Sequence, residues 1–140
     1  MHRLTSRALL LLCSSTLLTA CGDSTPAPTT PSPGPPPSVT EVFEGTLNRN
    51  GAGTHPFLAG ASGNVVATLD FIEPDTVTAL GISLGTWNGT ACQTVIANDN
   101  AAQGATVVGA ASIASNLCLR LYDVGKIPDV ASYQVTVVHP

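Results

Sequence analysis

Apolar and polar side chains alternate along several short segments, and this alternation restricts the fold more than any other feature of the chain. In the segment 64–72, Val65, Ala67, Leu69 and Phe71 fall on one face, and mostly polar residues fall on the other. Because successive side chains of a strand point to opposite sides, a period of two predicts a half-buried β-strand. We therefore expect all four of these apolar residues to face the core.

Other segments repeat the pattern, and turn-forming residues separate them. The predicted strands are 41–47, 64–72, 78–87, 91–97, 106–113, 116–122 and 133–138, with turns at 48–51, 73–75, 88–89 and 98–100. Helix signals are scarce, and the full pattern corresponds to about eight short strands. It predicts an all-β fold, an antiparallel β-sandwich with a jelly-roll-like arrangement, and a small barrel is the alternative.

Small residues mark one face of the strand at 78–87. Leu80, Ile82 and Leu84 point one way, while Gly81, Ser83 and Gly85 occupy the opposite face. A strand face without bulky side chains allows another group to come close. We expect the backbone of a neighbouring strand to do so.

The N-terminus has the features of an export signal. Arg3 and Arg7 precede the 13-residue segment 8–20, which is mostly apolar and ends in small residues. A membrane-spanning helix needs roughly 20 apolar residues, so this segment is too short for a permanent span. A cationic start and a short apolar middle predict a signal peptide over residues 1–20.

Leu18-Thr19-Ala20-Cys21 resembles the bacterial lipobox. The resemblance implies cleavage before Cys21 and a diacylglycerol on its sulfur, usually with a third acyl chain on the new amino group. Two or more acyl chains give stable anchoring. A plain secretory signal with an incidental Cys21 is the alternative. Gly22 follows Cys21 at the position where an aspartate retains some lipoproteins on the inner membrane. Its presence favours the outer membrane if the host has two membranes.

A proline-rich stretch follows the cysteine. Seven of the 17 residues from Gly22 to Ser38 are proline, and none is an apolar residue larger than alanine. Such a composition cannot form a core and is typical of a disordered, semi-rigid spacer. A proline-rich ligand for a partner's aromatic groove is the alternative reading. The predicted organisation is a signal peptide (1–20), a lipidated cysteine and linker (21–38), and a β-sandwich domain (39–140).

Charge narrows the classes of partner. Removal of residues 1–20 leaves three cations against nine acids, a net charge of −6. Nucleic-acid binding requires clustered lysine and arginine, so the sequence argues against a nucleic-acid partner. The chain also lacks a basic patch for anionic lipid headgroups. Membrane attachment is expected to depend on the N-terminal lipid alone.

Cys92 and Cys118 are the two cysteines that remain in the predicted domain. An even pair in an exported domain predicts a disulfide bond. The bond would close a loop of about 25 residues and contribute roughly 3.5 kcal/mol in the chain-entropy description. A metal site is the alternative, but the spacing of these cysteines and of the histidines matches no common zinc motif.

Two stretches of the domain carry a family resemblance. They are FEGTLNRNGAGTHPFLAGASGNVVATL near the start and LCLRLYDVGKIPDVASYQVTVVHP at the end. Their order of strands and turns resembles bacterial pre-peptidase C-terminal domains, which are small β-sandwiches appended to secreted enzymes. The resemblance covers nearly all of residues 41–139. It implies a non-catalytic accessory module that sometimes binds calcium or a polymeric substrate, and we expect no catalytic domain within residues 1–140 beside it.

Catalytic motifs are not evident, and we expect no enzyme activity. His55 and the penultimate His139 are interpreted as surface residues, which leaves no histidine base placed beside a serine nucleophile. We expect no obligatory cofactor. Asn98, Asp99 and Asn100 could offer oxygen ligands to calcium, although solvated turns explain the same residues. Trp87 could stack on a sugar ring or fill the core.

The sequence predicts a lipid-anchored cell-envelope protein that presents a binding or adhesion module. The expected partner is a glycan or an envelope protein. A purely structural or assembly component of the envelope is the alternative, and a small hydrolase is a third.

Overall fold

A computed structural model describes residues 34–140, and all regular structure within them is β. The signal peptide, Cys21 and most of the proline-rich stretch lie outside the described residues. Within residues 34–140 there is no helix, and so none that could span a membrane. The eight strands are β1 (Val39–Asn48), β2 (Ala52–Ala59), β3 (Gly63–Glu73), β4 (Leu80–Trp87), β5 (Cys92–Ala101), β6 (Thr106–Ala111), β7 (Ser115–Tyr122) and β8 (Val130–His139).

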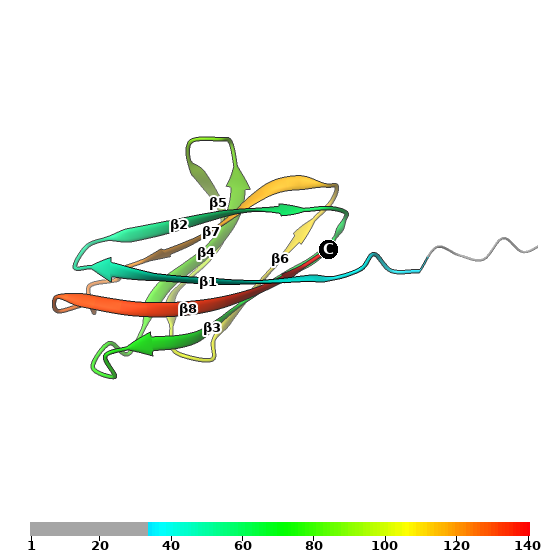
Figure 1. Cartoon of the computed structure of the whole chain (residues 1–140). Helices are drawn as coiled ribbons and strands as arrows, with labels where there is room; N and C mark the ends of the chain where they lie inside the picture. The colour runs from blue at the N-terminus through cyan, green and yellow to red at the C-terminus, as the bar shows by residue number, and fades with distance from the viewer. Residues whose placement is uncertain (1–33) are drawn as a thin grey trace, which may run out of the picture. The chain divides into compact units, whose positions relative to one another are not determined.

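The strands form two four-stranded antiparallel sheets that pack face to face (Figure 1). One sheet has the order β1-β8-β3-β6 and the other has the order β2-β7-β4-β5. Strand β1 pairs with β8, β2 with β7, β3 with β6 and β4 with β5, as in a long double-stranded ribbon that has been rolled up. This is the jelly-roll arrangement, so the predicted β-sandwich is confirmed.

The core lies between the two sheets and comes from the alternating positions of both. Leu80, Ile82 and Leu84 of β4 are buried, as the alternation predicted. The same is true of Leu117, Leu119 and Leu121 in β7 and of Tyr133, Val135 and Val137 in β8. Every residue of the buried cluster lies between 47 and 137, and residues 34–140 form one compact unit. The buried core therefore consists entirely of residues from this unit.

One inward position differs from the prediction. Leu69 pairs with Val135, but the next register pair joins Phe71 to Gln134, which leaves Asp70 as an extra residue. This β-bulge inverts the alternation, so that Ile72 is buried and Phe71 is only partly covered. The expectation that Phe71 faces the core is wrong, because a bulge exchanges the faces of all residues that follow it.

The small residues of β4 do allow close approach, as predicted. A Cβ atom at Gly85 would lie 2.1 Å from the carbonyl oxygen of Gln93, so the backbone of β5 occupies that space. At Gly81 the neighbour is a side chain, because a Cβ there would lie 2.2 Å from the ring of Tyr122. The outer face of β4 is thus covered by one backbone and one aromatic ring.

Candidate binding groove

A shallow groove of about 590 Å³ crosses the sheet that contains β1, β8 and β3. Its lining comes from these three strands and consists of Glu44, Gly45, Thr46, Phe71, Ser132, Tyr133 and Gln134. The bulge at Asp70 is what brings an aromatic side chain to this surface. The groove therefore combines one partly exposed ring with side chains that donate and accept hydrogen bonds.

Two hydrogen bonds hold polar side chains in place on this face. Gln134 donates from Nε2 to Oε1 of Glu44 over 2.7 Å, and the Thr136 hydroxyl donates to Oδ2 of Asp70 over 2.6 Å. The first bond joins β8 to β1 and the second joins β8 to β3. Each carboxylate uses one oxygen in these bonds and retains a second acceptor. Side chains ordered before binding lose less entropy when a ligand arrives.

A second hollow adjoins the groove and extends it toward the end of β3. Its lining includes Glu73, Asp75 and Ser132, and Ser132 also lines the groove itself. The hollow has a volume of about 420 Å³. The two depressions thus share Ser132.

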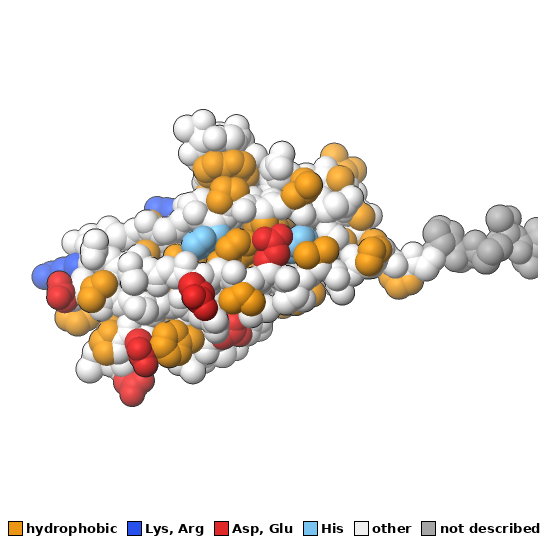
Figure 2. Space-filling model, in the orientation of Figure 1, with side chains coloured by type: hydrophobic (Ala, Val, Ile, Leu, Met, Phe, Trp, Pro, Cys, Tyr) orange, Lys and Arg blue, Asp and Glu red, His pale blue; other side chains and the backbone are white. Residues whose placement is uncertain are grey.

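This face is acidic. Acidic side chains are visible over β1, β8 and β3 in Figure 2, whereas basic side chains appear only toward the margins of the view. The linings of the two depressions contain Glu44, Glu73 and Asp75 but no lysine or arginine. An anionic ligand would be repelled here, while a neutral ligand with many hydroxyl groups would find a ring and several hydrogen-bonding partners.

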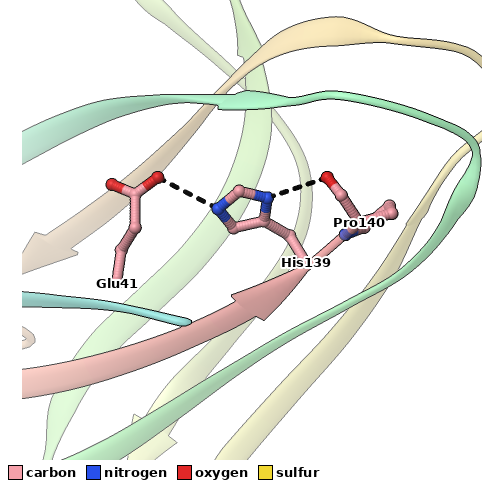
Figure 3. A network of polar contacts seen from close by, with 3 residues as sticks. All are labelled: Glu41, His139 and Pro140. Atoms are coloured by element: carbon pink, nitrogen blue, oxygen red, sulfur yellow. Dashed lines mark hydrogen bonds and ion pairs between the residues drawn. The ribbon is translucent and has the colours of Figure 1, made fainter. Parts of the chain in front are cut away.

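His139 does not lie on the surface, contrary to the sequence interpretation. It belongs to β8 and its side chain is 2% exposed. Its Nε2 lies 3.0 Å from Oε1 of Glu41, and its Nδ1 lies 3.1 Å from the carbonyl oxygen of Pro140 (Figure 3). Both partner atoms are oxygens that accept hydrogen bonds from the ring.

His55, in strand β2, is half-buried. Its Nε2 lies 2.7 Å from the Tyr133 hydroxyl oxygen, and its ring stacks on Phe43 with centroids 5.0 Å apart. Burial lowers the pKa of His55 and raises the pKa of Tyr133. Among the described residues, the hydrogen bonds of His55 and His139 include none to a serine, threonine or cysteine. These contacts indicate that both histidine rings fill the space between the edge strands β1 and β2.

Cys92 and Cys118 form the predicted disulfide bond, with Cα atoms 5.7 Å apart. Cys92 begins β5 and Cys118 lies in β7, two strands that are separated by β4 in the sheet order. The bond therefore joins strands that do not pair with each other. It holds β5 in place across β4.

The predicted turn at Asn98–Asn100 is wrong, because these residues belong to β5. The Tyr122 hydroxyl donates a hydrogen bond to Oδ1 of Asp99, and Oδ1 of Asn98 accepts from the backbone N–H of Asn100. Burial, followed by the nearby Asp99, raises the pKa of Tyr122 to about 12. Within residues 34–140 no three histidine, cysteine or acidic residues form a metal-binding group. Calcium at Asp99 stays a prediction.

Trp87 ends β4 and is partly exposed. It pairs with Cys92, next to a turn in which Oδ1 of Asn88 accepts the N–H groups of Thr90 and Ala91. It lies in the sheet opposite to that of Phe71. The structure thus places Trp87 outside the groove, and its role as a stacking residue stays a prediction.

The groove residues were not singled out by the sequence pattern. One signal was present, because Phe71 and Ile72 are adjacent and both are large and apolar. A regular strand with one solvent-exposed face would alternate apolar and polar side chains. Comparison with known proteins adds no assignment, since no family model matches the chain and no curated protein is significantly similar to it.

Proposed function

We propose that residues 39–140 form a non-catalytic module that binds neutral glycans at the cell envelope, where a lipid on Cys21 anchors the chain. The observation that carries the glycan proposal is the bulge at Asp70, which turns Phe71 outward into a polar groove. Sugar rings present an apolar face to an aromatic side chain and a rim of hydroxyl groups to polar neighbours. Phe71, Glu44 and Gln134 supply these two kinds of contact.

The acidic lining determines the kind of glycan. Carboxylates accept hydrogen bonds from hydroxyl groups, and such charge-assisted bonds are about twice as strong as neutral ones. A uronic acid or a phosphorylated sugar would place like charges together in a shallow site. The proposed ligand is therefore an uncharged polysaccharide or the uncharged part of an envelope glycan.

The anchor follows from the lipobox-like sequence Leu18–Cys21 and from the proline-rich stretch behind it. A stalk of this composition would separate the module from the membrane surface. Gly22 favours the outer membrane in a host with two membranes. The sequence resembles pre-peptidase C-terminal domains, and this resemblance supports the same class of role, that of an accessory module that recognises a polymer.

A structural or assembly role in the envelope is the second candidate. It is favoured by exposed apolar side chains, such as Val95 in β5 and Ile113 in the turn after β6. In this case the module would recognise proteins rather than glycans.

Thermal unfolding of residues 34–140 tests the glycan proposal, because a ligand that binds only the folded state raises Tm. At a ligand concentration of 100 times Kd the stabilisation is about 2.7 kcal/mol. We expect neutral gluco- or manno-oligosaccharides to raise Tm and a polyuronate to leave it unchanged. A flat response to all neutral glycans would support the structural role instead.

Metabolic labelling with a radioactive fatty acid tests the anchor in the full chain. The wild-type protein should incorporate label, and the variant Cys21→Ser should not. Equal labelling of both proteins, or labelling of neither, would contradict lipidation of Cys21.

A further inference from the structure

Four exposed apolar side chains surround one end of the sandwich. At this end β1 begins and β8 ends, and the β2–β3 and β6–β7 connections lie beside them (Figure 1). Ile113 lies in the β6–β7 turn and is 70% exposed. Val39, Val138 and Leu58 are 46%, 37% and 59% exposed, and each is the first or the last but one residue of its strand. We call these four residues the apolar rim.

The members of the apolar rim lie at nearly one level along the strands. A strand advances about 3.3 Å per residue, so each of them starts within about one residue of this end. Val39 and Val138 belong to one sheet, whereas Leu58 belongs to the other. A rigid protein would have to enclose the end from both sides to reach all of them. A bilayer is fluid, and its interfacial region accepts apolar side chains to a depth of about 5–10 Å.

The chain that leads back to Cys21 enters the domain at this same end. Pro35 and Pro36 precede β1 and line a hollow of about 240 Å³ together with Ser62 of the β2–β3 turn and Val138 of the rim. The N–H of Gly60 in that turn donates a hydrogen bond to the carbonyl oxygen of Pro140 over 2.8 Å, which fixes the turn beside the end of β8. The connection to the proposed anchor is therefore next to the apolar rim.

Charged side chains lie toward the opposite end. Arg49, Asp75 and Lys126 are in the turns there, and Figure 2 shows acidic and basic side chains on that part of the visible face and hydrophobic ones beside the entering chain. Glu41 is the charged residue of β1 closer to the rim, and its Oε1 lies 3.0 Å from Nε2 of His139. When the rim contacts a bilayer, most of the acidic surface points away from anionic headgroups.

The proposed anchor determines which surface this end meets. Residues 22–33 separate Cys21 from Gly34. A proline-rich chain rises about 3.1 Å per residue, so these residues keep the domain within roughly 40 Å of a lipid on Cys21. A short linker gives an effective concentration of about millimolar, so a contact too weak to hold a free domain still forms in an anchored chain. A soluble uncharged partner has no such connection to the rim.

We propose that the apolar rim contacts the lipid bilayer end-on, with its four side chains in the interfacial region. This contact depends on the proposed anchor, because the lipid holds the chain at the membrane and the rim sets the orientation of the domain. The groove lined by Glu44 and Phe71 lies toward the opposite ends of β1 and β3. It therefore stays in water and faces away from the membrane.

Chemical anchoring makes the contact testable apart from lipidation in cells. Cys92 and Cys118 are bonded to each other, so Cys21 supplies the free thiol of residues 21–140. This thiol is coupled to a maleimide-bearing phospholipid in phosphatidylcholine vesicles, and flotation of the vesicles verifies the coupling. Because the coupled lipid replaces the natural acyl chains, an absence of labelling in cells would contradict the anchor without changing the result of this experiment.

Tryptophan quenching by brominated phosphatidylcholine measures the contact. Trp87, the only tryptophan, is replaced by phenylalanine, and single tryptophans are introduced by Ile113→Trp on the rim or by Val130→Trp at the opposite end, where Val130 is 45% exposed. We expect severalfold stronger quenching at position 113 than at position 130. Equal quenching at the two positions, or none at position 113, overturns the proposal.

Ile113→Glu tests whether the rim acts as a unit. Ile113 is exposed in a turn, so this change should leave Tm nearly unchanged. With Val39→Trp as the reporter in the same Trp87→Phe chain, Ile113→Glu should remove most of the quenching, because a carboxylate does not enter the apolar part of the interface. The matched change Val130→Glu should not alter it. Undiminished quenching at position 39 in the Ile113→Glu variant would overturn the end-on contact.

Discussion

Phe71 lies opposite Gln134 on β8, a position that a regular register would give to Asp70. The displacement by one residue is the β-bulge in β3, and it has two consequences. Ile72 takes the core position, and the phenyl ring of Phe71 reaches the groove. A ligand site on this face therefore depends on one extra residue in one strand.

Phe71→Ala should weaken binding of a neutral oligosaccharide about two- to tenfold, because an aromatic contact contributes about 0.5–1.5 kcal/mol and 1.4 kcal/mol corresponds to a factor of ten. Isothermal titration calorimetry measures the change. Val42→Ala removes an exposed apolar side chain from β1 outside the groove and should not alter the affinity. Equal affinities of wild type and Phe71→Ala would exclude the groove as the site.

Gly81→Ala should destabilise the domain by about 1–3 kcal/mol, the usual cost of overpacking. The new Cβ would lie 2.2 Å from the Tyr122 ring, which would have to leave its hydrogen bond to Asp99. Urea unfolding measures the loss. Gly109→Ala, whose Cβ would lie 3.5 Å from Cδ1 of Leu84, should change the free energy of unfolding by less than about 1 kcal/mol. If both alanines had the same small effect, the Tyr122 ring would not be held against Gly81.

Replacement of both Cys92 and Cys118 by alanine should lower the free energy of unfolding by about 3.5 kcal/mol, because the bond closes a loop between positions 26 apart. Strand β5 buries only Ala101, so it should lose order before the rest of the sandwich. Hydrogen exchange would detect this as faster exchange in β5 than in β8. Uniform exchange across all strands would argue against a local role of the disulfide.

The stability of the domain should depend on pH through His55. Burial lowers its pKa below 6.5, so the folded state binds a proton less readily than the unfolded state. The contribution is fully present above pH 6.5 and is lost as the pH falls through the folded pKa. Tm should therefore decrease on acidification from pH 7 to about pH 5. His55→Gln should flatten this part of the profile, and an unchanged slope would assign the dependence to other groups.

Much of the fold is predictable from the chain itself. The period-two patterns of 116–122 and 133–138 identified the side chains that face the core, because a regular strand with one solvent-exposed face has to alternate. The pattern of 78–87 identified the core side of β4, but both of its faces are buried from Leu80 to Gly85. The pairing of Cys92 with Cys118 followed from an even number of cysteines and from the prediction of an export signal, and the structure confirms the bond. Pattern alone could not define the groove, since the adjacent Phe71 and Ile72 indicate an irregularity but do not show that β3 has one residue more than β8 requires.

Strand alternation, turn residues and cysteine number thus determined the all-β class, the inward faces and the disulfide, because these properties depend on neighbours in the sequence. The tertiary structure alone decided that Phe71 faces outward, that His139 is buried beside Glu41, and that Tyr122 reaches Asp99. Each of these depends on a partner strand distant in sequence. Register and burial are properties of the pair of strands, and a single strand does not contain them.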